Sequence, residues 1–118
     1  MNPLDFFISN FIVKNRKKRW QFLANGKWSK FAGKMNEIDN HLNSNCTRYE
    51  NNSFDKCKEI IDVNHIEYGY YYDSYSIGVK MSTTNLDDIF DDSLFICPQA
   101  KIAFFFHHDG WIWFCDAK

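Results

Sequence analysis

Apolar and polar residues alternate along this chain with two different periods, which predicts a mixture of helices and strands. Residues 4–12 carry apolar side chains at the three- and four-residue spacing of one helix face. Asn2 can cap this helix, Pro3 fits its first turn, and Asp5 complements the positive end of the helix dipole. The stripe that we expect to pack against the core comprises Leu4, Phe7, Ile8, Phe11 and Ile12.

Further helices are predicted on both sides of a polar segment. Residues 34–43 place three apolar side chains on one side, namely Met35, Ile38 and Leu42. Ser53 can cap a helix with an apolar face formed by Phe54, Cys57, Ile60 and Ile61. The polar residues 43–52 between these helices predict an exposed loop. Residues 86–92 predict a short helical turn that Asn85 can cap.

Apolar runs on either side of short turn sequences predict three β-hairpins. The paired runs are residues 19–24 with 27–31, 65–72 with 75–82, and 101–107 with 111–116. Asn25-Gly26 and Asp109-Gly110 are favourable turn dipeptides for the first and last hairpins. Residues 94–97 predict a short edge strand that ends at Pro98.

The last hairpin is predicted to be the centre of the sheet. Residues 102–106 and 111–114 are apolar at every position, and a strand loses its alternation when both of its faces are covered. The chain is therefore expected to form an α+β fold in a single domain spanning residues 1–118. Its antiparallel sheet would contain about six strands in hairpins, with two to three helices packed mainly on one face.

Charge is unevenly distributed along the 118 residues. Residues 1–19 contain five basic side chains and one acidic side chain, a net charge of +4, whereas residues 20–118 contain 9 basic and 14 acidic side chains, a net charge of −5. An acidic body disfavours general nucleic-acid binding and suits a partner with a basic surface. Aromatic residues make up 19% of the chain, and such residues favour sheets and protein interfaces.

The four cysteines, at positions 46, 57, 97 and 115, match no zinc-binding spacing. Three of them lie in apolar patterns, so we expect reduced, structural thiols and a cytoplasmic protein. The apolar residues 4–13 are too few to cross a membrane, and basic residues follow them instead of preceding them as in a signal peptide. No membrane association and no cofactor are predicted.

His107-His108-Asp109 is the first candidate for catalysis or metal binding, because histidine beside a carboxylate can act as a general base or metal ligand. Adjacent residues of a strand point to opposite faces, so the two histidines are not expected to share a metal. Polar residues are also common before a turn, which is the alternative interpretation. A small enzyme that uses His107 or His108 is therefore one hypothesis, and it requires a pocket and a second polar group beside one ring.

Clustered acids and tyrosines suggest instead a surface that binds a protein. Two pairs of acidic residues within positions 87–92 lack the glycine of a calcium-binding loop and can meet a basic partner. Tyrosines are frequent anchors of protein interfaces, and two of those in residues 68–75 are expected to be accessible. The predicted partner-binding residues are Asp87, Asp88, Asp91, Asp92, Tyr71 and Tyr75.

In size and composition the chain resembles the small bacterial immunity proteins that neutralise toxins, including those of contact-dependent inhibition systems. That resemblance implies a non-catalytic protein that binds a cognate toxin with a basic surface and covers its active site. A second hypothesis is a nucleotide- or RNA-binding domain in which Trp20 and Trp28 of the first predicted hairpin stack on a base. Quenching of tryptophan fluorescence by nucleotides would distinguish the second hypothesis from the first.

Overall fold

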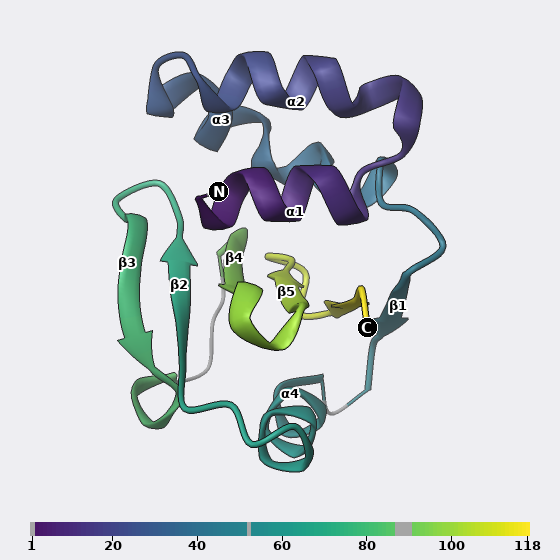
Figure 1. The fold of residues 1–118 in the computed structure, drawn as a ribbon, viewed down its shortest axis with the longest axis vertical. Helices are drawn as coiled ribbons and strands as arrows, with labels where there is room; N and C mark the ends of the chain where they lie inside the picture. The colour runs from purple at the N-terminus through teal and green to yellow at the C-terminus, as the bar shows by residue number, and fades with distance from the viewer. Residues whose placement is uncertain (1, 52, 87–90) are drawn as a thin grey trace.

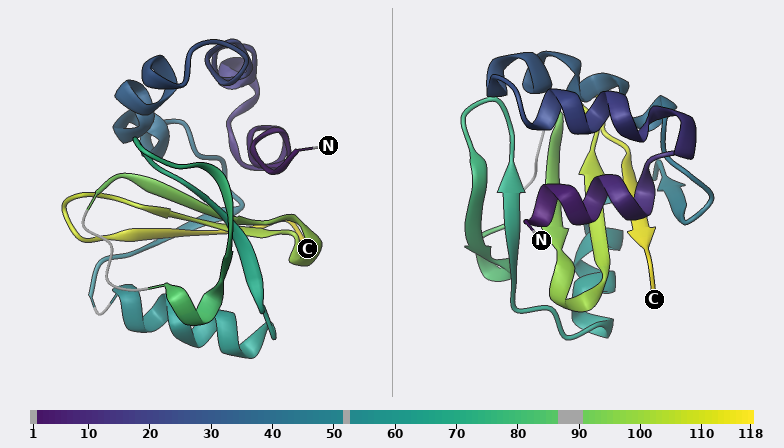
Figure 2. Two further views of the ribbon diagram at one scale, coloured as in Figure 1. Left: turned by 90° about the vertical axis from the view of Figure 1, so that its left-hand side faces the viewer. Right: turned by 45° about the horizontal axis from the view of Figure 1, so that its top comes forward.

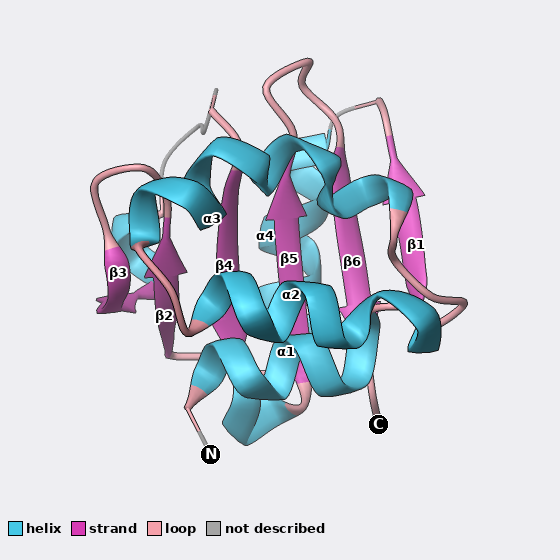
Figure 3. Cartoon of the chain, turned by 90° about the horizontal axis from the view of Figure 1, so that it is seen from above, coloured by secondary structure: helices cyan, strands magenta, loops and turns pink. Residues whose placement is uncertain are grey.

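The computed structural model describes residues 2–51, 53–86 and 91–118. Its centre is a six-stranded antiparallel sheet with the strand order β1-β6-β5-β4-β2-β3 (Figures 1 and 3). The strands are β1 (Cys46–Tyr49), β2 (Tyr68–Tyr72), β3 (Ile77–Ser82), β4 (Ser93–Cys97), β5 (Ile102–Phe106) and β6 (Ile112–Asp116). The predicted α+β class and the antiparallel sheet are confirmed.

Helices cover both faces of this sheet (Figure 2), and those of the described residues comprise three α-helices on one face and one on the other. The first group comprises α1 (Pro3–Phe11), α2 (Lys17–Ala24) and α3 (Trp28–Lys34), and α4 (Ser53–Val63) lies opposite. Short 3₁₀ helices occur at Lys14–Arg16, Met35–Asn40, Thr83–Asn85 and Pro98–Ala100. In the described ranges, no helix is sufficiently long and apolar to pass through a lipid bilayer.

The two central strands are buried along their whole length. Every residue of β4 and β5 is at most 1% exposed, because helices cover both faces at this position. Leu94 and Phe105 face α1–α3, whereas Phe95 and Phe104 face the α4 side. This arrangement confirms the central placement predicted for residues 102–106. It corrects the prediction for residues 94–97, which belong to an interior strand between β5 and β2.

The N-terminal helix follows its sequence signals. Asn2 Oδ1 accepts a hydrogen bond from the backbone N–H of Asp5 at 2.8 Å, and Pro3 occupies the first helical position. The predicted apolar stripe is buried against the sheet. The helix predicted after Ser53 is also present, and it buries Cys57, Ile60 and Ile61.

The hairpin predicted for residues 19–31 is wrong, since this segment forms α2 and α3. Burial follows helical spacing, with Trp20 and Leu23 three residues apart on the buried side of α2. Asn25-Gly26 forms the connection between the two helices, where the Asn25 N–H donates to Gln21 O at 3.1 Å. The apolar residues of this segment therefore contribute a helical layer above the sheet.

Three other predicted boundaries differ from the structure. Residues 43–52, predicted as a loop, contain β1, an edge strand paired with β6. The helix predicted at residues 34–43 is a 3₁₀ helix over Met35–Asn40, and β2 begins at Tyr68, not at residue 65. Most of the helical turn predicted at residues 86–92 lies outside the described residues.

All four cysteines are free thiols, and Cys57, Cys97 and Cys115 are buried. Burial raises the pKa of the Cys57 and Cys97 thiols to about 12. These thiols therefore stay protonated at neutral pH and act as small apolar side chains in the core.

A glycine at position 69 is required by the packing of β2 on β4. A Cβ atom at Gly69 would lie 2.5 Å from the Phe95 ring and 2.8 Å from Cys97 Sγ, and both side chains are fully buried. We expect Gly69→Ala to lower the unfolding free energy by about 1–3 kcal/mol through overpacking, as measured by urea denaturation. Gly33→Ala is the matched control, because nothing lies within 4 Å of its added Cβ. It should be neutral or stabilising in α3, and equal stability of the two variants would contradict this account.

Candidate functional site

The strand register brings chain segments that are distant in sequence to one end of the sheet (Figure 3). Tyr72 pairs with Leu94, Ser93 with Phe106, and Phe106 with Ile112. The end of β2, the start of β4 and the turn from β5 to β6 therefore lie side by side. The end of β1 and the start of β3 complete this end of the sheet.

Carboxylates gather at this end, which we call the acidic end. Contacts with the histidines of the β5–β6 turn place Asp39, Asp92 and Asp109 there, Asp73 follows β2, and Asp91 precedes β4. The predicted site residues Asp91 and Asp92 are thus both present at the acidic end. Asp87 and Asp88 lie outside the described residues. The residues that define the acidic end are Asp39, Asp73, Asp91, Asp92 and Asp109.

Asp92 contacts both the ring and the backbone of His108 at the acidic end. His108 Nδ1 lies 3.0 Å and 3.1 Å from the two carboxylate oxygens of Asp92, and the His108 backbone N–H donates to Asp92 Oδ1 at 3.1 Å. The hydrogen bond with Asp92 raises the pKa of His108, and the charges of Asp92, Asp109 and Asp39 add to this shift. The pair ties the start of β4 to the β5–β6 turn.

Both ring nitrogens of His108 face carboxylates, because Nε2 lies 3.5 Å from Asp109 Oδ1. This environment favours the doubly protonated imidazolium, in which neither nitrogen has a lone pair to accept a proton. The enzyme hypothesis required a polar group beside one histidine, and Asp92 is such a group. The second carboxylate therefore disfavours a general-base role for His108.

Four planar groups form a continuous column at the centre of this end. The Arg48 guanidinium lies 3.8 Å from the Trp111 ring centroid, Trp111 stacks on His107 at 4.2 Å, and His107 stacks on His108 at 4.2 Å. His107 is only 7% exposed, and its Nε2 faces Asp39 Oδ2 at 3.9 Å. The two histidine rings are therefore held in place by stacking within the column and by the contact of His107 with Asp39 from the helix layer.

The predicted placement of the two histidines on opposite faces is wrong, because both lie in the turn after β5. Asp92, His107 and His108 each offer a ligand atom within 4.8 Å of the others, a spacing that suggests a metal site. However, the stacked imidazole planes are inclined by only 27°. A metal binds in the ring plane about 2 Å from the nitrogen, and two nearly parallel planes do not meet within that distance. In addition, His107 Nδ1 already accepts the Asp109 N–H at 3.0 Å.

The two predicted tyrosines flank the acids but differ in exposure. Tyr71 is half-buried, and burial raises the pKa of its hydroxyl. The carboxylates of Asp73 and Asp91 raise this pKa further, whereas a hydrogen bond with Ser93 lowers it. Tyr75 is 96% exposed at the tip of the β2–β3 hairpin. The edge strand β3 continues this surface with Ile77 and Val79, which are 63% and 48% exposed. Such a run of exposed apolar residues is typical of a contact surface.

The tryptophans proposed to stack on a base do not lie on a hairpin. Trp20 is 2% exposed in α2, and its Nε1 donates to His41 Nδ1 at 3.1 Å. Trp28 stacks on Phe31 in α3, and its Nε1 donates to Asp73 O at 2.8 Å. Both rings are thus engaged by the protein itself, and Trp28 supports the β2–β3 hairpin.

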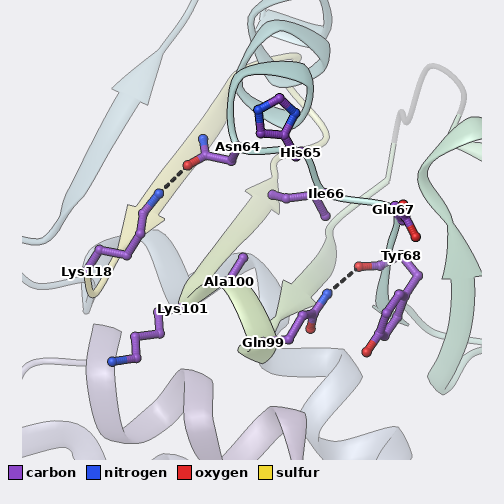
Figure 4. A pocket seen from close by; sticks show the side chains of 9 residues that line it. All are labelled: Asn64, His65, Ile66, Glu67, Tyr68, Gln99, Ala100, Lys101 and Lys118. Carbon is purple, nitrogen blue, oxygen red and sulfur yellow. Dashed lines mark hydrogen bonds between the residues drawn. The ribbon is translucent and has the colours of Figure 1, made fainter.

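A pocket of about 560 Å³ opens at the opposite end of the sheet (Figure 4). Lys118 Nζ donates to Asn64 Oδ1, and Gln99 Nε2 donates to Tyr68 O. Lys101 points away from these groups (Figure 4). Lys118, Asn64 and Gln99 are therefore engaged in hydrogen bonds within the protein, and the polar side chains do not converge on a common point.

Sequence reasoning missed several residues of the acidic end. Asp109 belongs to the candidate His107-His108-Asp109 sequence but is not among the predicted partner-binding residues. Arg48 falls in the predicted loop over residues 43–52, and its contact with Trp111 requires the pairing of β1 with β6. No local signal in the sequence connects Asp39 with His107.

No protein-family model, curated protein or solved structure matches this chain. The functional interpretation therefore rests on the geometry of the acidic end.

The contact between Asp92 and His108 is expected to shift the pH at which the His108 ring titrates. We expect the His108 imidazole to titrate above 6.5, its ordinary value, and Asp92→Asn to lower the titration midpoint, as measured by NMR. Asp109→Asn should lower it less, because the Asp109 charge is a smaller cause of the shift.

The same contact should make stability depend on pH. The pKa of His108 is raised in the folded state, so the stabilisation from Asp92 is present below pH 6.5 and is lost as the pH rises through the folded-state pKa. The difference in unfolding free energy between the wild type and Asp92→Asn should therefore decrease as the pH rises from 6.5 through the folded-state pKa of His108. A His108 midpoint that Asp92→Asn leaves unchanged would contradict the assigned cause.

Proposed function

We propose that the protein is a non-catalytic binding protein that recognises a protein partner with a basic surface and acts by covering that surface. The observation that supports this most directly is the gathering of the acidic end beside the fully accessible Tyr75. Carboxylates steer a basic partner during association, and an exposed aromatic ring supplies contact area in the complex.

The charge of the acidic end is only partly compensated within the protein. Arg48 forms an ion pair with Glu50 and stacks on Trp111, so its charge is already engaged. His108 compensates one carboxylate when it is protonated. Asp91 and Asp109 are exposed, which leaves their charges available to a partner.

The β2–β3 hairpin presents Tyr75 on a supported backbone. The Asp73 N–H donates to Ser76 O at 3.0 Å, and Asp73 Oδ1 accepts the Tyr75 N–H at 2.8 Å. The indole of Trp28 donates to Asp73 O and holds the hairpin against α3. A pre-organised anchor loses less conformational entropy on binding than a flexible one.

Among basic partners, we infer that a bacterial toxin is the class that fits best. Toxins that act on nucleic acids need lysine and arginine side chains around the active site, and an acidic surface that covers them prevents substrate binding. The protein would then serve as the immunity protein of such a toxin and act in the bacterial cytoplasm. The resemblance in size and composition agrees with this class.

A capture experiment tests the proposed function. The tagged protein is incubated with lysate of its source cells at about 50 mM and about 300 mM salt, and bound proteins are identified by mass spectrometry. We expect one stoichiometric basic protein whose recovery falls at the higher salt concentration. Recovery of nucleic acid alone, or of an acidic protein at both concentrations, would contradict the proposal.

Charge reversal locates the interface once the partner is purified. Changing Asp87, Asp88, Asp91 and Asp92 to Lys should weaken binding at least about tenfold and reduce its salt dependence, as measured by calorimetry. A second variant changes only Asp87, Asp88 and Asp91, which leaves the contact between Asp92 and His108 intact.

The matched control for that triple variant is the reversal of Glu59, Asp62 and Glu67, which alters net charge equally on α4 and the segment after it. The control should retain affinity. Equal losses in the two triple variants would show that net charge, and not the acidic end, determines binding.

Removal of the exposed ring at the hairpin tip should separate binding from stability. We expect Tyr75→Ala to weaken partner binding by about 2 kcal/mol or more while it changes the unfolding free energy by less than about 0.5 kcal/mol. Val63→Ala is a suitable control, since Val63 is 70% exposed at the end of α4 near the opposite end of the sheet. Unchanged affinity of Tyr75→Ala would remove the hairpin tip from the interface.

A further inference from the structure

The column of planar groups at the acidic end begins with the Arg48 guanidinium and ends with the partly exposed His108 ring. We call the Arg48 end the closed side and the His108 end the open side. Arg48 lies against Trp111 at the closed side, where its guanidinium is 3.8 Å from the ring centroid. His107 fills the centre and contacts Trp111 and His108 on its two faces. His108 ends the column, and its side chain is 47% exposed.

The open side offers the two kinds of group that contact the Arg48 guanidinium at the closed side, namely an aromatic ring and a carboxylate. His108 offers an aromatic ring that stacks on His107 and keeps 47% of its side chain exposed. Carboxylates lie at both ring nitrogens: Asp92 at 3.0 Å from Nδ1 and Asp109 at 3.5 Å from Nε2. At the closed side, Arg48 likewise combines a stacked ring with a carboxylate, that of Glu50.

We propose that the exposed face of His108, with the carboxylates of Asp92 and Asp109, binds the guanidinium of an arginine side chain from the partner. This inference rests on the proposed function and names the group that the acidic end recognises. A guanidinium is planar, stacks on aromatic rings and donates hydrogen bonds in a fork that matches a carboxylate. Lysine carries the same charge but has no planar group to extend the column.

Electrostatics favours a cation at this position even when His108 is protonated. The charges that face the His108 ring are those of Asp39, Asp92 and Asp109. Arg48 is separated from His108 by two rings of the column and is paired with Glu50. One imidazolium therefore leaves the site negative, and the loss of its proton makes the site more negative still.

Asp109 is the carboxylate best placed to meet the incoming group. Its side chain is 56% exposed, whereas that of Asp92 is 22% exposed and is engaged with the backbone and ring of His108. Asp92 therefore positions the ring, and Asp109 is available to form the ion pair with the guanidinium.

The test uses the folded full chain and two small probes, L-arginine amide and L-lysine amide. Each is titrated into isotope-labelled protein at a pH above the measured midpoint of His108, and backbone amide and histidine ring signals are followed by NMR. We expect L-arginine amide to shift the signals of His108 and Asp109 and to bind at least about threefold more tightly than L-lysine amide. Absence of these shifts, or equal binding of the two probes, would overturn the inference.

Variants of the protein separate the contribution of the His108 ring to probe binding from that of the Asp109 charge. His108→Ala should abolish the preference for L-arginine amide, and His108→Tyr should restore it, because tyrosine returns an aromatic face without the titratable nitrogen atoms. Asp109→Asn should weaken the binding of both probes, and that of L-arginine amide more, because only a guanidinium donates hydrogen bonds in a fork to the carboxylate. His65→Ala removes an exposed histidine at the opposite end and should leave both titrations unchanged. Retention of the arginine preference in His108→Ala would contradict the proposed stacking.

Failure of this inference and failure of the proposed function give different results. If L-arginine amide does not bind but charge reversal still weakens partner binding, the acidic end is the interface and the guanidinium site is absent. If L-arginine amide binds but charge reversal has no effect on the partner, the guanidinium site is real and the partner binds elsewhere.

Discussion

Burial of β4 and β5 on both faces is the constraint on which the rest of this structure depends. Apolar residues at every position of these strands require a cover on each side, which α1–α3 and α4 provide. The same burial requires small residues at the closest contacts, as at Gly69 above Phe95. With two covered faces, only the ends and outer edges of the sheet remain accessible to a partner.

The acidic end follows from this constraint and from the antiparallel register. Hairpin connections return the chain repeatedly to the same end, so polar residues of several turns meet there. The Asp92–His108 pair joins two of these turns, and the column from Arg48 to His108 joins β1 with the β5–β6 turn. The proposed interface is thus attached to regular strands, which favours recognition without a large rearrangement.

Sequence patterns predicted those elements in which local and tertiary preferences agree. The N-terminal helix has a cap and a regular stripe, and the last hairpin has a turn dipeptide between two apolar runs. Residues 19–31 were misassigned because the turn signal of Asn25-Gly26 was given more weight than the helical spacing of Trp20 and Leu23. Of the predicted site residues, Asp91, Asp92, Tyr71 and Tyr75 lie at one end of the sheet, but the stacking of Arg48 there depends on the pairing of β1 with β6, which no local pattern reveals.

Hydrogen–deuterium exchange on the purified complex tests the central claim most directly, namely that the acidic end is the surface covered by a partner. We expect slower exchange on binding in residues 73–79, 91–92 and 107–111, which belong to the β2–β3 hairpin, the start of β4 and the β5–β6 turn. Residues 64–68 and 98–101, around the pocket at the opposite end, should exchange as in the free protein. Protection confined to that pocket, with the acidic end unchanged, would contradict the claim.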